Sequence, residues 1–331
     1  MTTARSNEYA IRVPGPVDPS ETFRFASNDG TDLYGEFFAA RDPRGAEPMT
    51  LARAAVVVAH GYFEHCGRYR ELAHVLTRAR ISVLSYDMRG HGRSAGQRGH
   101  IGDIGEYLDD LAAALEELDR RVRAAQPEPE VPRFLLGHSN GGLVILRALC
   151  DPVRKPDRIA AAVLSSPFLG FGTGVAPTKD LIGRALGRLL PRLSLPNQLA
   201  LDELTSDPEK QEERRLDTLC HDSASTRWYT CVLAAHDYVA EFAARIDVPT
   251  LWLVAADDRV ADPAVSRAVR ARLRTPSLYY SLAGMQHEVF NERERGRVFD
   301  RLVSCLQEMI RPDDNDLAQG TFARSRPPLY T

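Results

Sequence analysis

The sequence predicts an α/β fold in which helices flank a mostly parallel central sheet. Short apolar runs rich in β-branched residues, such as Ala54–Gly61 and Ile81–Asp87, are typical of strands buried on both faces. Segments with helical spacing, such as Ile104–Ala125, separate these runs. Because the two patterns alternate over most of the chain, we expect parallel strands that are joined by helical crossovers.

A hairpin is predicted at the start of the fold. Thr22–Ala26 and Leu33–Phe38 have strand-like composition, and Asn28-Asp29-Gly30 between them is a turn sequence. The amphipathic helix Ile104–Ala125 ends at Gln126-Pro127, since proline cannot continue a helix. The other expected elements, in chain order, are helix Tyr69–Ala79, strand Arg133–His138, helix Leu143–Cys150, strand Ala160–Ser166, helix Thr226–Arg245, strand Pro249–Ala256, helix Pro263–Leu273, strand Ser277–Ala283 and helix Arg297–Ile310.

The alternation of strands and helices stops between Pro167 and about Arg227. A structureless loop of roughly sixty residues is too long for a compact domain. We therefore predict that residues 167–227 form a helical cap inserted into a core made of residues 21–166 and 228–310. Residues 1–20 and 311–331 are polar and rich in proline, and are expected to be loose ends.

The composition argues against several classes of function. A net charge of −3 leaves no basic surface for nucleic acid. The five cysteines have no zinc-site spacing, so we expect no metal and no cofactor. The N-terminus lacks the apolar core of a signal peptide, and no apolar run is long enough to span a bilayer, which favours a cytoplasmic protein, either free or peripheral to a membrane. Nothing in the sequence indicates an oligomeric state.

The segment Gly137-His138-Ser139-Asn140-Gly141 has the form G-x-S-x-G. In a chain of this length such a match arises by chance about one time in ten, so its setting carries the argument. An apolar strand precedes it and a helix follows, which is the setting of a nucleophile elbow. We therefore predict that Ser139 is a nucleophile. The alternative is a glycine-rich turn with an incidental serine, or a turn that binds phosphate.

A nucleophilic serine needs a base and an acid that orients the base, and in this setting they follow in the order serine, acid, histidine. His287 lies in the segment Gly284–Glu288, which follows the last predicted strand, and is the last histidine of the chain. Asp257 and Asp258 follow the strand before it, and only one of these adjacent side chains can face the imidazole. Asp262 suits the N-cap of the next helix. Because a protonated His287 cannot act as a base, the rate should fall below roughly pH 6–7.

Two backbone N–H groups are expected to stabilise the oxyanion. One belongs to Asn140, the residue after the nucleophile, and the other comes from the loop after an earlier strand. Tyr62 is the natural second donor, because it directly follows His60-Gly61 at the end of a buried strand.

Four motifs between Ala54 and Ile310 resemble those of one enzyme family. They are His60-Gly61-Tyr62-Phe63-Glu64-His65 with Gly67-Arg68-Tyr69, Tyr86-Asp87-Met88-Arg89-Gly90-His91-Gly92-Arg93-Ser94, Gly137–Gly142, and Gln286-His287-Glu288 with Asn291-Glu292. In this combination the chain resembles the monoacylglycerol lipase and lysophospholipase branch of the α/β-hydrolases, which is often grouped with the serine aminopeptidase-like hydrolases.

The resemblance implies an α/β-hydrolase fold with an inserted helical cap, and a Ser-His-Asp triad that works through an acyl-enzyme. The acid loop of the family reads G-x-x-D followed by an apolar pair, and Asp258-Arg259-Val260-Ala261 fits that register better than Asp257 does. The chain departs from the family pattern at two positions, with Asn140 in place of the usual Met and Ala255 in place of the usual Gly. Asn140 retains its backbone N–H, whereas its polar side chain puts the acyl-chain preference in question.

Within the expected cap, Lys179–Leu195 has the pattern of an amphipathic cationic helix. Apolar residues recur every four positions on one face, and Arg184, Arg188 and Arg192 share the opposite face; the apolar residues are Leu181, Ala185, Leu189 and Leu193. Such a helix suits a lid over an acyl pocket or transient contact with a membrane surface, and it equally suits a helix packed on the body with its arginines solvated. We therefore expect a small-molecule lipid ester as substrate. The alternatives are an aminopeptidase or amidase and a short-chain carboxylesterase.

Overall fold

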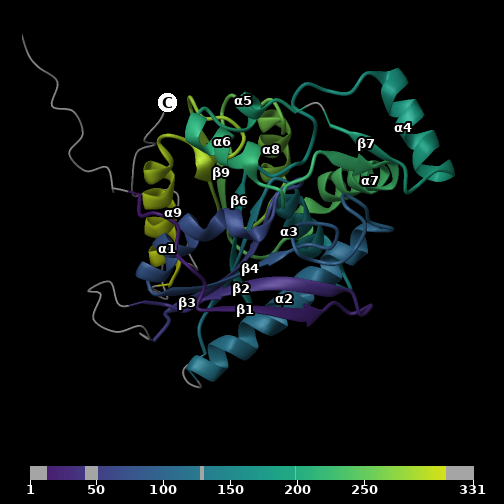
Figure 1. The fold of residues 1–331 in the computed structure, drawn as a ribbon. Helices are drawn as coiled ribbons and strands as arrows, with labels where there is room; N and C mark the ends of the chain where they lie inside the picture. The colour runs from purple at the N-terminus through teal and green to yellow at the C-terminus, as the bar shows by residue number, and fades with distance from the viewer. Residues whose placement is uncertain (1–12, 42–50, 127–129, 198, 311–331) are drawn as a thin grey trace, which may run out of the picture.

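The computed structural model describes residues 13–41, 51–126, 130–197 and 199–310. In this part of the chain eight strands form one sheet, in the order β1-β2-β4-β3-β5-β6-β9-β10 (Figure 1). The strands from β4 to β10 run parallel, and β1 and β2 are antiparallel to their neighbours, which confirms the predicted fold class. Their bounds are β1 Glu21–Ala26, β2 Asp32–Phe38, β3 Ala54–Ala59, β4 Ile81–Asp87, β5 Arg133–His138, β6 Ile159–Ser165, β9 Thr250–Ala255 and β10 Ser277–Leu282.

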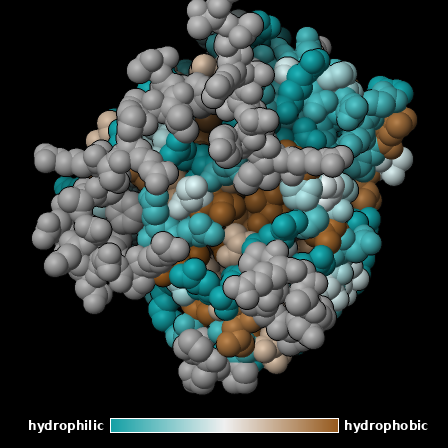
Figure 2. All heavy atoms as spheres, turned by 90° about the vertical axis from the view of Figure 1, so that its left-hand side faces the viewer, coloured by the Kyte–Doolittle hydropathy of each residue, from teal (hydrophilic) through white to brown (hydrophobic). Residues whose placement is uncertain are grey.

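Helices cover both faces of the sheet. Side chains of a strand alternate between the two faces, and because apolar side chains lie on both, each face packs against helices. Val57 and Leu135 pack against the helices of one face, while Val56 and Leu136 pack against those of the other. The first face carries α2 (Ile104–Ala125), α3 (Asn140–Cys150), α7 (Thr226–Phe242) and α8 (Pro263–Arg270), and the second carries α1 (Arg70–Arg78) and α9 (Arg295–Ile310). On the side of α1 and α9, apolar side chains gather near the middle and hydrophilic ones surround them (Figure 2).

The segment between β6 and α7 contains short elements only. They are α4 (Pro177–Leu189), β7 (Ser194–Pro196), α5 (Leu201–Leu204), α6 (Pro208–Leu216) and β8 (Ser223–Ser225), and β7 pairs with β8 in a small separate sheet. Figure 1 shows α5 and α6 near each other at the top of the molecule and α4 apart from them at the upper right edge, near α7.

The amphipathic helix predicted over Lys179–Leu195 is wrong in its last part, since α4 ends at Leu189. Pro191 lacks an N–H and restricts Leu190 before it to non-helical backbone, which here has φ −134° and ψ 63°. The chain then turns into β7.

The packing of α4 also differs from a leucine-faced lid. Gly183 and Gly187 face α7, where a Cβ on Gly187 would lie 2.5 Å from the Thr230 side chain. Glycine therefore lets the two helices approach closely. Leucines of the apolar face that the sequence pattern predicts are exposed to solvent, with Leu181 70% and Leu189 76% exposed.

Most of the two expected loose ends, residues 1–20 and 311–331, lies outside the described residues. Residues 13–20 are described and contain no helix or strand. Among the described helices, none combines the length and the apolar character that crossing a bilayer requires.

Candidate active site

Ser139 occupies a strained turn between β5 and α3. Its backbone has φ +51° and ψ −116°, a conformation that a non-glycine residue adopts only when its surroundings enforce it. Those surroundings require glycine, because a Cβ on Gly141 would lie 2.1 Å from the carbonyl oxygen of Ala59. A Cβ on Gly137 would similarly lie 2.5 Å from the carbonyl oxygen of Gly141. The turn directs Ser139 into the wall of a large cavity.

His287 lines the same cavity and is bonded to Asp258. Its Nδ1 lies 2.7 Å from Oδ2 of Asp258, and Oδ1 of that carboxylate accepts the backbone N–H groups of Val260 and Ala261 at 2.8 and 2.9 Å. A carboxylate fixed in this way holds the Nδ1–H tautomer and leaves Nε2 free to accept a proton.

The two neighbouring aspartates face elsewhere. Asp257 is exposed and accepts the N–H of Gly284, and Asp262 caps α8 by accepting the N–H of Ala264. Of the three candidates, Asp258 is therefore the one whose carboxylate contacts the imidazole.

Burial and the carboxylate act in opposite directions on His287. Burial lowers its pKa, and the charge and hydrogen bond of Asp258 raise it more, so the pKa lies above the usual 6.5. For Asp258, burial raises the pKa, and the imidazole together with two backbone N–H groups lowers it below 3.8. Asp258 is thus ionised at neutral pH, and His287 loses its ability to accept a proton as the pH falls through its raised pKa.

The N–H group of Tyr62 belongs to the loop after β3, and that of Asn140 belongs to the residue after Ser139, at the start of α3. Within the described part of the chain, neither N–H has a protein acceptor. Free N–H groups beside a nucleophile are what an oxyanion site requires.

The loop that carries Tyr62 is held by a buried ionic network. Glu64 Oε1 accepts the N–H of Gly61 and the hydroxyl of Tyr69, each at 2.6 Å. Arg68 pairs with Glu64 at 3.0 Å and with Glu288 at 2.5 Å, and so links this loop to the loop that carries His287. Burial would raise the pKa of Glu64, but Arg68 and two nearby imidazoles lower it to about 2.

The sequence prediction assigned no role to Glu64, Arg68 or Glu288, although all three stand in the quoted motifs. The available signal was the charge itself, since charged side chains are rarely buried unless they are paired.

Charged side chains of the Tyr86–Ser94 motif stabilise the loop that follows β4. Asp87 accepts the N–H groups of Cys66 and Arg93, each at 2.7 Å. Arg89 pairs with Asp110 and Asp29. Their charges and hydrogen-bonding groups are used within the fold, away from the residues that line the cavity.

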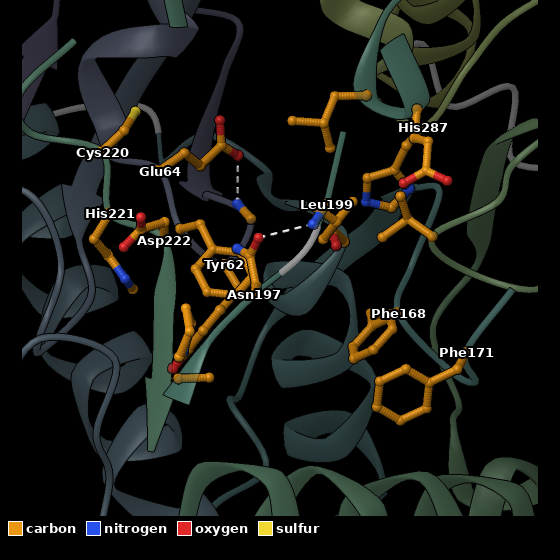
Figure 3. Close-up of a pocket in the computed structure, with 18 of the residues that line it drawn as sticks. Tyr62, Glu64, Phe168, Phe171, Asn197, Leu199, Cys220, His221, Asp222 and His287 are labelled. Atoms are coloured by element: carbon orange, nitrogen blue, oxygen red, sulfur yellow. Dashed lines mark hydrogen bonds between the residues drawn. The ribbon is translucent and has the colours of Figure 1, made fainter. Parts of the chain in front are cut away.

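The cavity measures about 1050 Å³ and has two chemically different sides. Phe168 and Phe171 lie on the side of His287, whereas Glu64, Cys220, His221 and Asp222 lie on the other side (Figure 3). Elements of the segment between β6 and α7 supply most of both walls.

One group among the described residues has the composition of a metal site. Single ligand atoms of His65, Asp217 and Cys220 lie within 4.8 Å of one another. Their bonding is already satisfied, because His65 Nε2 contacts Asp217 at 2.7 Å and Arg214 donates to the Cys220 sulfur at 2.9 Å. Burial raises the pKa of this thiol to about 11, and the neighbouring guanidinium would repel a cation.

Similar proteins are lipid-ester hydrolases. The monoacylglycerol lipase of Mycolicibacterium smegmatis is 32% identical over 261 residues, which cover 78% of this chain and 90% of that protein. The phospholipase YtpA of Bacillus subtilis is 32% identical over 259 residues, which cover 78% and 96%. The crystal structure of a monoacylglycerol lipase from Paleococcus ferrophilus is 30% identical with a TM-score of 0.70, over 84% of this chain and 98% of that one.

Residues 50–294 match the family described as "Serine aminopeptidase, S33", a span that includes Ser139, Asp258 and His287. The three similar proteins described above are carboxylester hydrolases of the α/β-hydrolase fold. The chain is therefore a hydrolase that belongs to the serine aminopeptidase S33 family, with monoacylglycerol lipases among its relatives.

Proposed function

We propose that this protein hydrolyses lipid esters of the monoacylglycerol or lysophospholipid type through an acyl-enzyme on Ser139. The observation that carries the proposal is that His287, which is hydrogen-bonded to Asp258, lines the same cavity as Ser139. The similarity to monoacylglycerol lipases and to a phospholipase supports the substrate class.

In the proposed reaction His287 Nε2 takes the hydroxyl proton of Ser139 while the serine oxygen bonds to the ester carbonyl carbon. The N–H groups of Tyr62 and Asn140 stabilise the negative oxygen. When the tetrahedral intermediate collapses, the ester C–O bond breaks and His287 donates its proton to the leaving alcohol. Water, deprotonated by the same imidazole, then releases the acid and restores Ser139.

The two sides of the cavity suggest how a lipid ester would lie. The aromatic wall of Phe168 and Phe171 suits an acyl chain, because burying each methylene gains about 0.8 kcal/mol. The polar wall at Cys220, His221 and Asp222 suits the hydrated head group. An ester with a long acyl chain and a small polar alcohol therefore fits this site better than a short-chain ester.

A substrate panel tests this proposal. We expect kcat/KM to rise by about ten-fold or more from 4-nitrophenyl acetate to the decanoate, and 1-monooleoylglycerol or oleoyl lysophosphatidylcholine to be turned over with release of oleate. A preference for acetate would indicate a short-chain carboxylesterase. Faster cleavage of amino-acid 4-nitroanilides than of any ester would indicate an aminopeptidase.

We further propose that residues 167–227 act as a cap and that α4 is its contact with a lipid surface. Leu181, Ile182 and Leu189 are 70%, 58% and 76% exposed, and Arg184 and Arg188 on the same helix are exposed as well. Apolar and cationic side chains together on one exposed helix match an interfacial helix on anionic lipid.

The double substitution Leu181→Ser and Leu189→Ser is expected to weaken binding to phosphatidylglycerol vesicles by roughly ten-fold or more, measured by co-sedimentation. Hydrolysis of a water-soluble ester should be unchanged, since neither side chain lines the cavity. Val153→Ser is the matched control, because Val153 is 86% exposed after the end of α3, away from the cap. Equal vesicle binding by the double variant and the unmodified protein would contradict the contact.

A further inference from the structure

Trp228, in the first turn of α7, stacks on the ring of Tyr62. The two ring centroids are 3.8 Å apart, the planes are inclined by 24°, and the indole is 6% exposed. The hydroxyl at the far end of Tyr62 donates to the carbonyl oxygen of Gly99 at 2.6 Å. The indole and this hydrogen bond together leave the Tyr62 side chain a single position.

The indole of Trp228 also lines the cavity that contains Ser139. It lies parallel to the ring of Phe168, with an interplanar angle of 3° and centroids 6.4 Å apart. The N–H of Phe168 donates to the carbonyl oxygen of Ser139 at 2.9 Å. The indole is therefore stacked on the residue that carries the second proposed oxyanion donor and lies parallel to a residue that is hydrogen-bonded to the turn of Ser139.

The backbone around Tyr62 needs such external support. Phe63 has φ +69°, which is strained for a bulky residue and persists only where the surroundings enforce it. Its carbonyl oxygen accepts the N–H of His221 at 3.1 Å, and Ser225 donates its N–H to the same Gly99 oxygen that Tyr62 uses. The chain just before Trp228 thus adds support from outside the loop to the support that Glu64 and Arg68 give from within it.

Trp228 is itself fixed in place. The backbone N–H of Trp228 donates at 3.1 Å to the hydroxyl of Ser225, which caps α7. The cap fixes the backbone of the first turn of α7, while the stacking on Tyr62 and the 6% exposure of the side chain restrict the indole.

We propose that Trp228 is a positioning residue that sets the distance between the Tyr62 N–H and Ser139. The inference rests on the proposed acyl-enzyme function. An oxyanion donor must lie within about 0.2 Å of its hydrogen-bonding position, and a misplacement of about 1 Å costs on the order of 10²-fold in rate. Loss of the indole should therefore reduce stabilisation of the tetrahedral intermediate more than it reduces binding of the acyl chain.

The test compares Trp228→Leu with Trp228→Phe, which retains a flat ring. For Trp228→Leu we expect kcat on a 4-nitrophenyl ester to fall on the order of 30-fold while KM changes by less than about three-fold. The affinity for a long-chain trifluoromethyl ketone, whose hemiketal oxygen occupies the oxyanion site, should fall in parallel with kcat. The affinity for the free fatty acid should stay constant. Trp228→Phe should restore most of the rate.

Tyr238→Leu is the matched control, since it removes another partly buried ring from α7 outside the cavity. It should leave kcat and the ketone affinity unchanged. If Trp228→Leu does not fold, Trp228→Met replaces it, because methionine fills the space without a flat face. An equal loss of ketone and fatty-acid affinity, or no loss of either, would overturn the positioning role. Failure of the unmodified protein to hydrolyse the ester would instead refute the proposed function.

Discussion

Replacing Ser139 by alanine is expected to lower kcat for lipid-ester hydrolysis by roughly 10⁵-fold or more, the scale seen when a catalytic serine is removed. The substitution deletes only the oxygen that would form the acyl-enzyme. Because Ser139 begins a turn shaped by its glycine neighbours, alanine should leave the fold and lipid binding intact.

A fluorophosphonate probe provides the measurement, since it forms a covalent bond with an activated serine only. The unmodified protein should be labelled, and the Ser139→Ala variant should not. Ser266→Ala is the control, because Ser266 is a buried serine on α8 outside the cavity, and this variant should be labelled like the unmodified protein. Labelling that persists in Ser139→Ala would exclude this residue as the nucleophile.

Replacing Asp258 by asparagine is expected to lower kcat by about 10⁴-fold. The amide oxygen can still accept the N–H groups of Val260 and Ala261, so the loop should keep its shape. The amide NH₂ would then face His287 Nδ1 and donate to it. That contact moves the ring proton to Nε2, which can no longer accept the proton of Ser139.

Asp257→Asn is the matched control, one residue away. Asp257 is exposed, and an amide oxygen can still accept the N–H of Gly284, so we expect a change of less than about two-fold. If Asp257→Asn were the damaging substitution, the assignment of the acid would be reversed.

The pH profile separates an orienting carboxylate from one that merely supports the loop. In the unmodified protein the acid limb of kcat/KM should lie above pH 6.5, because Asp258 holds the pKa of His287 above that value. In Asp258→Asn the charge and the hydrogen bond of Asp258 are gone, and against burial only the smaller effects of Glu288 and Glu64 still raise the pKa of His287, so the limb of the residual activity should move to lower pH. A limb that stays in place would show that the carboxylate does not act on His287.

Elements with strong local signals were predicted well from the sequence. The bounds of α2 agree with the prediction, because Asp103 caps its start and Gln126-Pro127 follows its end. The C-terminal end of α4 was predicted wrongly, because the apolar periodicity continues past Pro191, a residue that stops a helix. The packing face of α4 was missed because a hydrophobic pattern does not record how closely two glycines let a neighbour approach.

The candidate site divides in the same way. Parallel strands bring the residues that follow them to one edge of the sheet, so the order of Ser139 and His287 along the chain was enough to predict one shared cavity. The choice between Asp257 and Asp258 depends on side-chain direction within a folded loop. It could be expected from family resemblance, and the contact itself is visible only in three dimensions.

The sequence by itself determined the alternation of strands and helices and the strained serine turn, because each depends on residues that are close together in the chain. The order of Ser139, Asp258 and His287 can be read directly along the sequence. Only the tertiary structure decided which distant side chains support them. Arg68 contacts Glu288, which is 220 residues away in the chain. Tyr62 precedes the inserted segment in the chain and stacks on Trp228, which follows that segment. Such contacts depend on how whole elements pack, and no local pattern of charge or hydrophobicity specifies that packing.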